Sequence, residues 1–364
     1  MDPVKSLFEQ YTGQTIRTFE ELPSSGSNRR YFRITGDDVT LIGARGTSVP
    51  ENIAFWKMAC HFKEKGLNVP EVLAHNSDFT CYLQEDLGND TLFNLVADGR
   101  EKGQYSPAEK ALIFKAIRAL PQIQFEGAEG LDFSVCFPQP EFDERMISFD
   151  QNYFKYCFLK ATGLEFSEIK LDKDFRTMSD ILMQSMSDTF LYRDFQARNV
   201  MIKYGEPYFI DFQGGRKGPI YYDVASFILQ AKAAYSETFK MELIDAYLDA
   251  LKKYMPISRS DFMETLRHFV LFRTLQVLGA YGFRGYFEKK PHFLQSVPYA
   301  MENLRRLLKK PFEEYPYLRS TPHTAPACPG SSARWAAECR NSLPWAESPW
   351  SRGCRYDAAR RRAW

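Results

Sequence analysis

The feature that most constrains this chain is a pair of polar residues set just before a predicted β-hairpin. Asp194 and Asn199 lie five residues apart, and two apolar segments within residues 200–210 follow them, separated by a turn that contains Gly and Pro. Asp211 comes directly after the second apolar segment. Because a hairpin returns the chain to its starting point, its two ends lie side by side. The sequence therefore predicts that Asp194, Asn199 and Asp211 surround one point.

These three side chains suit the transfer of a phosphoryl group. One carboxylate can accept or orient the proton of an attacking hydroxyl, while a second carboxylate and an amide oxygen can hold Mg²⁺ against nucleotide phosphates. Mg²⁺ keeps several waters, so two protein ligands plus phosphate oxygens suffice. The alternative is that an Asp and an Asn at this spacing form an ordinary turn or cap. The hairpin, and the aspartate that ends it, favour the catalytic interpretation.

Composition limits the partners of the chain. Its 364 residues carry a net charge of +1 and are 44% hydrophobic, a balance that gives no reason to expect nucleic acid or an anionic membrane as a partner. No apolar run reaches the roughly 18 residues that span a bilayer, and the first residues do not resemble a signal peptide. The seven cysteines form no C-x-x-C pair, which favours free thiols over a metal site or disulfide framework. We therefore expect a cytoplasmic protein.

Two regions of different character follow one another along the chain. The first eighty-odd residues predict a small α+β unit of short strands and helices, in which strands at 30–34 and 39–42 are joined by a turn at 36–38. One of its helices is expected from about residue 51 to residue 65, with Ile53, Trp56 and Cys60 facing inward. The polar segment Glu85–Gly88 is the best candidate for a hinge. Beyond it the sequence pattern is mainly helical, and Ser106 and Glu109 predict a capping box at the start of one helix.

The last 46 residues differ from everything before them. They hold eight arginines, no lysine and four of the five tryptophans, and they show no helical or strand period. Three interpretations compete: a native disordered tail, a basic and aromatic binding tail, and an out-of-frame or otherwise aberrant extension from about residue 320. The last is favoured, because tryptophan is unusual in disordered segments. We assign no function to this region.

On its polar motifs the chain resembles the aminoglycoside phosphotransferase family, relatives of the protein kinases that include choline and sugar kinases. The resemblance spans roughly residues 20–310 and is strongest in Tyr192–Asn199, Ile210–Gln213 and Gly218–Ser226. It implies an α+β, two-lobed protein-kinase-like fold with a small β-rich N-lobe and a larger, mainly helical C-lobe. The expected parts are a nucleotide-binding lobe over 1–85, a catalytic and substrate lobe over 86–318, and the disordered or aberrant tail over 319–364.

The resemblance implies a role for each polar residue of these motifs. Asp194 would be the catalytic base, and Asn199 and Asp211 would bind Mg²⁺. ATP would be the phosphoryl donor. Asp223 would brace the catalytic loop through hydrogen bonds, although an aspartate there can also be the N-cap of the helix that follows.

The chain departs from the family pattern at two places. The residue two before the catalytic aspartate is usually a histidine of mostly structural role, and Tyr192 is expected to be a tolerable substitute. The strand lysine that grips the α- and β-phosphates is missing, because no lysine occurs between Arg33 and Lys57. Arg45 is a candidate substitute, though an arginine fork is not a lysine point charge; the alternative is an exposed strand-end charge. Glu51 matches the glutamate that would pair with such a cation, or is a first-turn acid favoured by the helix dipole.

The same resemblance assigns further residues to the nucleotide and the substrate. Ser27 and Asn28 belong to a turn of small residues that would lie over the nucleotide phosphates. Glu85 and Leu87, with the residues around them, would offer backbone groups to the adenine edge. Arg198 would meet the transferred phosphate or a substrate acid, or pair with a neighbouring carboxylate.

The missing lysine indicates which members of the family the chain resembles most. Anomeric kinases for N-acetylmuramate and N-acetylglucosamine look similar in this respect and in the motifs Arg29–Arg33, Arg193–Phe195 and Asp211–Gln213. We therefore predict an ATP- and Mg²⁺-dependent kinase whose partner is a small molecule, an N-acetylated amino sugar. The alternatives are an aminoglycoside or choline-type kinase and a catalytically weak pseudokinase that acts as a nucleotide-binding scaffold. A protein kinase is disfavoured, because the short path from Asp211 to Asp223 leaves little room for an activation segment.

Overall fold

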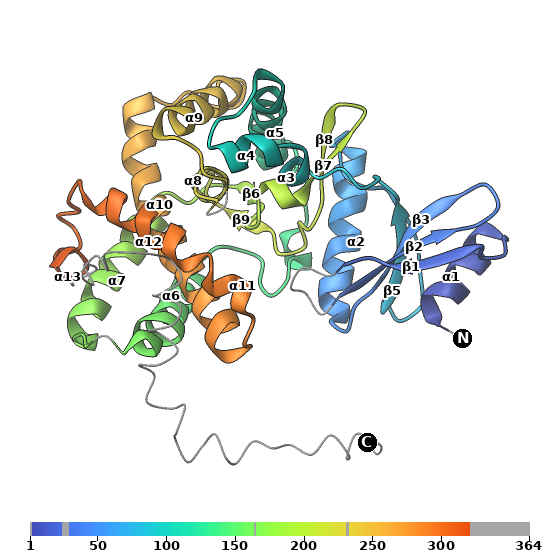
Figure 1. The fold of residues 1–364 in the computed structure, drawn as a ribbon, viewed down its shortest axis with the longest axis horizontal. Helices are drawn as coiled ribbons and strands as arrows, with labels where there is room; N and C mark the ends of the chain where they lie inside the picture. The colour runs from blue at the N-terminus through green and yellow to red at the C-terminus, as the bar shows by residue number, and fades with distance from the viewer. Residues whose placement is uncertain (1, 24–28, 164, 231–232, 321–364) are drawn as a thin grey trace, which may run out of the picture. The chain divides into compact units, whose positions relative to one another are not determined.

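The computed structural model describes residues 2–23, 29–163, 165–230 and 233–320, and its chain divides into two compact units (Figure 1). The first unit combines Met1–Ile147 with Met178–Arg273, and the second combines Ser148–Thr177 with the chain from Thr274 onward. The predicted lobe boundary at residue 85 lies inside the first unit, so the three-part division stays a prediction. The predicted tail lies outside the described residues from residue 321 onward.

A five-stranded antiparallel sheet forms the N-terminal part of the first unit. Its strand order is β1-β2-β3-β5-β4, and a register shift between Val72 and Ala74 interrupts the last pair. The predicted strands around residues 30–34 and 39–42 and the turn between them are confirmed, and a first strand is added to them. The strands are β1 (Thr18–Glu21), β2 (Arg30–Thr35), β3 (Thr40–Arg45), β4 (Val72–His75) and β5 (Cys81–Glu85).

Helix α1 (Pro3–Thr12) covers one face of this sheet (Figure 1). Asp2 caps it by accepting a hydrogen bond from the Val4 backbone N–H at 2.9 Å, and Gly13 ends it in the left-handed conformation at φ 68°. The helix and sheet share a buried apolar core that gives this face its stability. Its members are Val4, Leu7, Phe8, Phe32, Ile34, Leu41, Cys81 and Leu83.

Helix α2 (Val49–Glu64) covers the opposite face of the sheet and corrects one prediction. The sequence pattern favoured Ile53, Trp56 and Cys60 as its inward side, but all three are only half-buried. The buried side instead carries Phe55 and Phe62, with Asn52, Ala54, Met58 and Ala59. Apolar residues occur on most sides of this helix. Their helical period alone therefore did not indicate which side is buried.

The remaining chain of the first unit is mainly helical, as expected. Helix α5 (Pro107–Phe125) begins with a capping box in which Ser106 and Glu109 satisfy each other's backbone N–H groups. It packs beside α9 (Glu237–Leu251), where the Tyr247 hydroxyl donates to the Gln124 side-chain oxygen at 2.6 Å. The shorter elements are α3 (Leu92–Leu95), α4 (Ala97–Lys102), η1 (Phe133–Val135) and α8 (Tyr221–Ile228).

Two small two-stranded sheets carry the predicted catalytic motifs. Strand β6 (Thr189–Leu191) pairs with β9 (Arg216–Gly218), and β7 (Val200–Lys203) pairs with β8 (Glu206–Phe209). The β7–β8 pair confirms the predicted hairpin, with a shorter turn than expected. Only Tyr204 and Gly205 turn the chain, at φ 54° and 76°, so Pro207 lies within β8 instead of in the turn.

The second unit holds helical segments from two separate stretches of chain. Its stretches share α6 (Glu144–Phe154), α7 (Glu168–Met183) and α10 (Arg259–Gly282) with the first unit, because the boundaries fall inside these helices. Within it, a Cβ on Gly282 would lie 2.1 Å from the Cys157 carbonyl oxygen, so glycine is required for this backbone contact. Its other elements are η2 (Lys155–Leu159), η3 (Lys160–Thr162), η5 (Phe283–Phe287), α11 (Pro291–Leu294), α12 (Val297–Leu308) and α13 (Pro316–Ser320).

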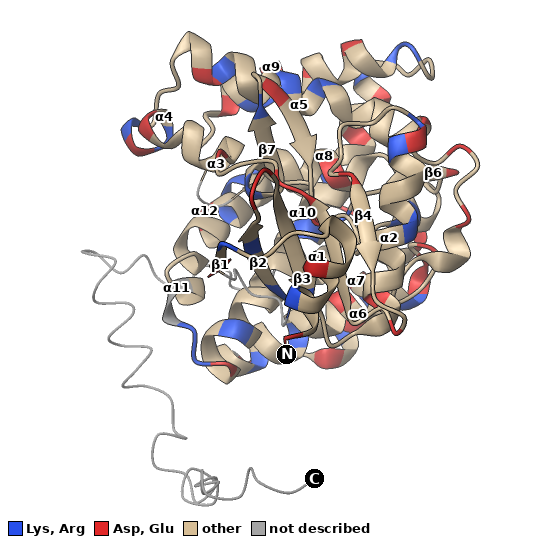
Figure 2. Ribbon diagram, turned by 90° about the vertical axis from the view of Figure 1, so that its right-hand side faces the viewer, with Lys and Arg blue, Asp and Glu red and all other residues tan. Residues whose placement is uncertain are grey.

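Charges and cysteines agree with the composition. Figure 2 shows Lys and Arg interspersed with Asp and Glu along the described ribbon rather than gathered in one element. Among the described residues, Cys60, Cys81, Cys136 and Cys157 are free thiols, as predicted. No helix in the described part of the chain is long and apolar enough to cross a membrane.

Candidate active site

The loop between β6 and β7 is held by one buried carboxylate. Asp223, fully buried in the first turn of α8, accepts hydrogen bonds from the backbone N–H groups of Tyr192 and Arg193 at 2.7 and 2.8 Å. Burial raises the pKa of Asp223 to about 7, while the two backbone hydrogen bonds act in the opposite direction. The bracing role that the family resemblance implies for Asp223 requires hydrogen bonds of this kind, and the role itself stays a prediction. The N-cap alternative is not observed, because α8 begins at Tyr221.

The structure brings Asp194, Asn199 and Asp211 together. The Asn199 side-chain amide donates to the Asp194 backbone carbonyl at 2.9 Å and to the Asp211 carboxylate at 3.3 Å. The Ile210 backbone N–H donates to the Asn199 carbonyl at 3.0 Å, which ties the two ends of the hairpin. Asp211 itself is left-handed at φ 66°, a conformation that turns the chain sharply where the hairpin ends. The predicted convergence therefore follows from the hairpin.

Tyr192 adds a second link between the loop and the hairpin. Its buried hydroxyl donates a hydrogen bond to the Ile210 carbonyl, directly before Asp211. Burial raises the pKa of Tyr192 well above its ordinary value, so the hydroxyl stays protonated and remains a donor. This bond is a physical reason why a tyrosine can stand where the family usually has histidine.

Phe212 connects the same point to the N-terminal sheet. Its fully buried ring stacks on Phe55 of α2 at 5.0 Å between centroids and meets Phe62 edge-on at 5.2 Å. Phe55 in turn stacks on Tyr82 of β5 at 5.1 Å. This chain of rings places Asp211 relative to α2 and the sheet by packing alone.

The electrostatics of Asp211 fit a bound cation. Burial and the negative charge of Asp194 raise the pKa of Asp211 to about 6, while a 2.7 Å hydrogen bond from Gln213 and the charge of Arg29 lower it. A divalent cation would relieve this excess of negative charge, and the carboxylate and amide oxygens present are the hard ligands that Mg²⁺ prefers. The described residues contain no cluster of three or more His, Cys, Asp or Glu that could hold a metal by itself.

Arg273 is a further residue at the site, which the sequence reasoning missed. Its guanidinium lies 3.5 Å from the Asp194 carboxylate, and its side chain is 11% exposed where that of Asp194 is 49% exposed. Arg273 also donates to the Ser226 hydroxyl at 3.3 Å and lies over the Tyr222 ring at 5.5 Å. The available signal was that Arg273 is the only residue among Asp, Glu, Lys and Arg between Arg267 and Arg284, in a mainly apolar part of α10. A charge in such a segment needs a partner inside the fold.

Glu51 lies in the first turn of α2, and the cation that it pairs with is not Arg45. Glu51 pairs with Arg29 at 3.3 Å, and Arg29 is 3% exposed. Arg45 pairs instead with Asp2 of the α1 cap at 3.0 Å. The structure therefore places Arg29, and not Arg45, at the site. The only sequence signal for Arg29 was that it belongs to an arginine-rich motif.

The remaining predicted site residues, Glu85, Leu87 and Arg198, make different kinds of contact. The Glu85 carboxylate pairs with Lys203 at 2.6 Å and its backbone N–H donates to the Glu71 carbonyl at 2.8 Å. Leu87 is buried. The exposed Arg198 guanidinium lies over the Phe93 ring at 4.5 Å rather than against a carboxylate.

Ser27 and Asn28 lie outside the described residues.

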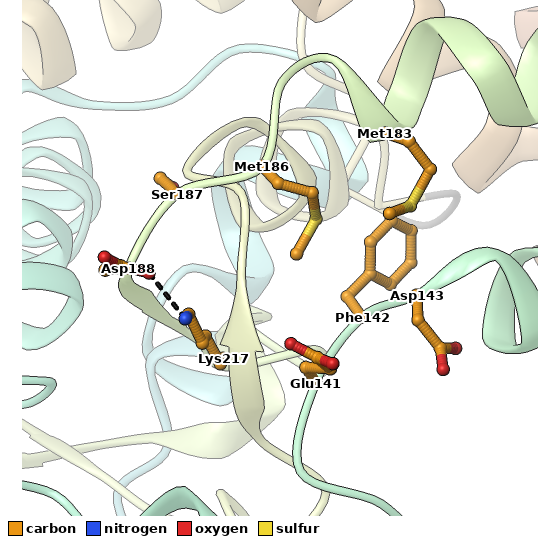
Figure 3. A pocket seen from close by; sticks show the side chains of 8 residues that line it. All are labelled: Glu141, Phe142, Asp143, Met183, Met186, Ser187, Asp188 and Lys217. Atoms are coloured by element: carbon orange, nitrogen blue, oxygen red, sulfur yellow. Dashed lines mark ion pairs between the residues drawn. The ribbon is translucent and has the colours of Figure 1, made fainter.

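A cavity of about 330 Å³ lies elsewhere in the first unit (Figure 3). Figure 3 shows Met183 and Phe142 side by side at one end of it and the Asp188–Lys217 ion pair of 2.5 Å at the other. None of the predicted site residues lines this cavity. It has no part in the chemistry considered below.

Two curated relatives resemble the chain over most of its length. It is 28% identical over 292 residues to the N-acetylmuramate/N-acetylglucosamine kinase of Neisseria meningitidis, which covers 78% of this chain and 83% of the relative. The identity is 26% over 283 residues to the protein of that name from Pseudomonas aeruginosa, covering 76% of this chain and 79% of the relative.

Two solved structures that resemble this chain are described as a phosphotransferase and a kinase of small molecules. A putative aminoglycoside phosphotransferase from Ralstonia eutropha matches with a TM-score of 0.58 at 11% identity, over 84% of this chain and 97% of that one. A choline kinase from Streptococcus pneumoniae matches with a TM-score of 0.53 at 12% identity, over 81% and 94%. At these identities the likeness shows the fold, and it confirms the predicted two-lobed, protein-kinase-like class.

A family model gives the assignment at the level of sequence. The model described as the phosphotransferase enzyme family matches residues 18–259, which is more than half of the chain and contains the loop, the hairpin, Asp211 and Asp223. The resemblance seen in the sequence is thereby confirmed. The chain belongs to the phosphotransferase enzyme family, and it is a phosphotransferase enzyme.

Proposed function

We propose that the chain is an ATP- and Mg²⁺-dependent kinase that phosphorylates an N-acetylated amino sugar of the N-acetylmuramate or N-acetylglucosamine type. The single observation that carries the kinase chemistry is the convergence of Asp194, Asn199 and Asp211 through the hydrogen bonds of the Asn199 amide. The names of the curated relatives support the amino-sugar acceptor.

In the proposed mechanism, each polar residue has one task. Asp194, the half-exposed carboxylate, accepts the proton of the acceptor hydroxyl as that oxygen bonds to the terminal phosphorus of ATP, the bond from this phosphorus to the bridging oxygen breaks and ADP leaves. Asn199 and Asp211 would hold Mg²⁺, which would supply charge neutralisation on the phosphate oxygens. Asp223 keeps the loop in place through its two backbone hydrogen bonds. Most of the rate acceleration then comes from positioning and electrostatics.

A nucleotide donor is supported by related structures as well as by the site. An amicoumacin kinase of the same fold was solved with AMP-PNP and Ca²⁺, and a choline kinase was solved with AMP. These ligands belong to those proteins. Here the raised pKa of Asp211 and the hard oxygen donors beside it agree with a metal-bound nucleotide.

Arg273 favours a neutral or anionic acceptor over a cationic one. Its charge lies 3.5 Å from the Asp194 carboxylate and offsets the negative charge that would attract an ammonium group to the catalytic base. A choline or polyamine-like acceptor beside Asp194 would therefore gain little net attraction from this ion pair, whereas a neutral sugar hydroxyl needs none.

The test is ADP release by the purified protein with ATP and Mg²⁺ over a panel of acceptors. N-acetylmuramate and N-acetylglucosamine are expected to be turned over, and Asp194→Ala to abolish the reaction. Turnover of choline or an aminoglycoside without any amino sugar would overturn the acceptor assignment. Nucleotide binding with no activity above that of Asp194→Ala would identify a pseudokinase scaffold instead.

A further inference from the structure

Strand parity explains why β3 offers no cation to the nucleotide side of the sheet. Ala44 lies opposite Tyr82 in the register, and Tyr82 stacks on α2, so Ala44 faces α2. Arg45, one residue on, faces α1 and pairs with Asp2. The next residue on the α2 face is Gly46, where a Cβ would lie 2.4 Å from the side-chain oxygen of Asn52. Neither Ala44 nor Gly46 carries a charge, so this part of the chain supplies no cation to the α2 face.

Arg29 fills the corresponding position from the neighbouring strand. The last pair of the β2–β3 register joins Arg30 to Arg45, so one further step sets Arg29 opposite Gly46. Alternation then places Arg29 on the α2 face, and its contacts agree. Its guanidinium donates to the Tyr31 hydroxyl at 3.3 Å and lies about 6 Å from the rings of two α2-side aromatics, 5.9 Å from Phe55 and 6.0 Å from Tyr82.

Packing connects Arg29 to the predicted metal site. Glu51 of α2 pairs with Arg29 at 3.3 Å, and Phe55, whose ring lies 5.9 Å from the guanidinium, stacks on Phe212, the residue that follows Asp211. Removing a guanidinium from water is costly even when it is paired, and an apolar side chain would fill the same space at less cost. A buried arginine that pairs with a helix acid beside the predicted metal site is therefore better explained by a bound anion than by packing.

We propose that Arg29, held by Glu51, binds the α- and β-phosphates of the nucleotide donor in place of the missing β3 lysine. The planar guanidinium can donate two parallel N–H groups to phosphate oxygens, which a lysine cannot do. Glu51 orients the fork from α2. The inference rests on the proposed function in taking a nucleotide as the donor, and it assigns the phosphate contact to a different strand from the one that the sequence pattern indicated.

The test compares adenosine with ADP, because only ADP carries the phosphates that Arg29 would hold. Dissociation constants are measured by calorimetry in the presence of Mg²⁺ for the wild type and for Arg29→Met, Arg29→Lys and Glu51→Gln. Arg29→Met is expected to weaken ADP about 10- to 100-fold, the usual range for one lost charged hydrogen-bonding group, and to leave adenosine within about twofold. Arg29→Lys is expected to recover part of the loss, and Glu51→Gln to produce a smaller one.

Arg30→Met is the matched control, because Arg30 is the adjacent arginine but is exposed and paired with Glu21 on the α1 face of the same strand. It should leave both constants unchanged. Arg45→Met tests the rival residue: selective loss of ADP binding in Arg45→Met but not in Arg29→Met would overturn the proposal. So would equal weakening of adenosine and ADP by the Arg29 variants, which is the result expected of a structural role.

The outcomes also separate this inference from the proposed function. Wild-type protein that binds neither ADP nor ATP with Mg²⁺ would refute the nucleotide donor itself. ADP binding that survives Arg29→Met would refute only the role of Arg29. If Arg29→Met does not fold, as judged by circular dichroism, Arg29→Lys and Glu51→Gln decide the question by the same adenosine and ADP comparison.

Discussion

At the scale of single residues, the site is defined by charges that the fold removes from water. Asp223 is fully buried and Arg273 nearly so, and each contacts the catalytic loop directly, Asp223 through backbone N–H groups and Arg273 through the Asp194 carboxylate. Such groups are costly to bury unless they are paired and hydrogen-bonded. Their presence beside Asp194 therefore marks the loop as a place where geometry is controlled.

Replacing the proposed base should remove turnover and leave the fold intact. We expect Asp194→Asn to lower kcat by about 10²- to 10⁴-fold, the usual contribution of a general base, while the affinity for ADP changes little. The measurement is steady-state kinetics with an amino sugar, alongside calorimetry with ADP. A variant that keeps more than half of the wild-type kcat would contradict the assignment.

Arg273 should affect the acceptor side of the reaction and not the donor side. We expect Arg273→Gln to lower kcat/KM for the sugar about tenfold or more, because Asp194 loses the cation that orients it, and to leave ADP binding unchanged. Arg273→Lys should restore part of the activity. An equal loss of ADP affinity and of sugar turnover would indicate that Arg273 only supports the fold.

At the scale of elements, the site depends on how α2, the hairpin and α5 are joined to their neighbours. Phe212 follows Asp211 directly and packs between Phe55 and Phe62 of α2. At its C-terminal end α5 is joined to the end of α9 by Glu126, which accepts hydrogen bonds from Lys253 at 2.7 Å and from the Tyr254 hydroxyl at 2.6 Å. Packing positions Asp211, the proposed metal ligand, and polar contacts join α5 to α9.

The α2 contact should be visible in both stability and metal binding. Phe212→Ala removes a fully buried ring and is expected to lower the free energy of unfolding by about 3–5 kcal/mol. Phe212→Leu, which keeps most of the volume, should cost less and should still weaken ADP binding in Mg²⁺ if packing positions Asp211. Urea unfolding and calorimetry measure the two effects. Unchanged ADP affinity in Phe212→Leu would show that the ring acts on stability alone.

The α5–α9 contact should depend on pH. Hydrogen bonds from Lys253 and Tyr254 lower the pKa of Glu126 to about 2, against about 4.5 for an ordinary glutamate. A lowered pKa means that the ionised form is favoured in the folded state, so its stabilisation is present above pH 4.5 and is lost as the pH falls towards 2. We expect Glu126→Gln to destabilise the protein by about 1 kcal/mol at pH 7, discounted for the exposure of Lys253, and the difference to vanish near pH 2.

Urea titrations of wild type and Glu126→Gln at pH 7, 5 and 3 check this sign. A difference that grows as the pH falls would contradict it.

At the scale of the whole molecule, the chain comprises two compact units, and every residue of the proposed site belongs to the first. The first unit is built from two separated stretches, Met1–Ile147 and Met178–Arg273, so α2 with Glu51 and the loop with Asp194 come from distant parts of the sequence. A ligand that binds both stretches should stabilise the folded chain by mass action.

Nucleotide and Mg²⁺ should therefore stabilise the protein together more than either does alone. At a ligand concentration about 100 times Kd, the expected gain is about 2.7 kcal/mol, which appears as an increase in Tm. EDTA should remove most of that gain, and Asp211→Asn should show the ADP effect without its dependence on Mg²⁺. Thermal scans with ADP, Mg²⁺, both and EDTA measure it. An equal increase with ADP in Mg²⁺ and in EDTA would argue against the metal ligands proposed here.

Much of the fold followed from local patterns. The capping box at Ser106 and the turn after β2 could be predicted from the sequence, because they depend on residues that are close along the chain. The inward side of α2 was not, because it is selected by which of several apolar residues meet Tyr82 and Phe212. The β6–β9 pair was also missed, since its two short strands are joined only through long-range contacts.

The sequence by itself determined that three polar residues meet at one point. Asp194, Asn199 and Asp211 are brought together by a hairpin, a local structure whose ends must meet, so spacing and residue type were enough to predict it. Only the tertiary structure decided the cations around that point. Strand parity turns Arg45 towards α1, and long-range packing brings Arg29 to Glu51 and Arg273 to Asp194. Charged residues that pair across distant segments have no characteristic spacing in the sequence, so their pairing cannot be predicted from it.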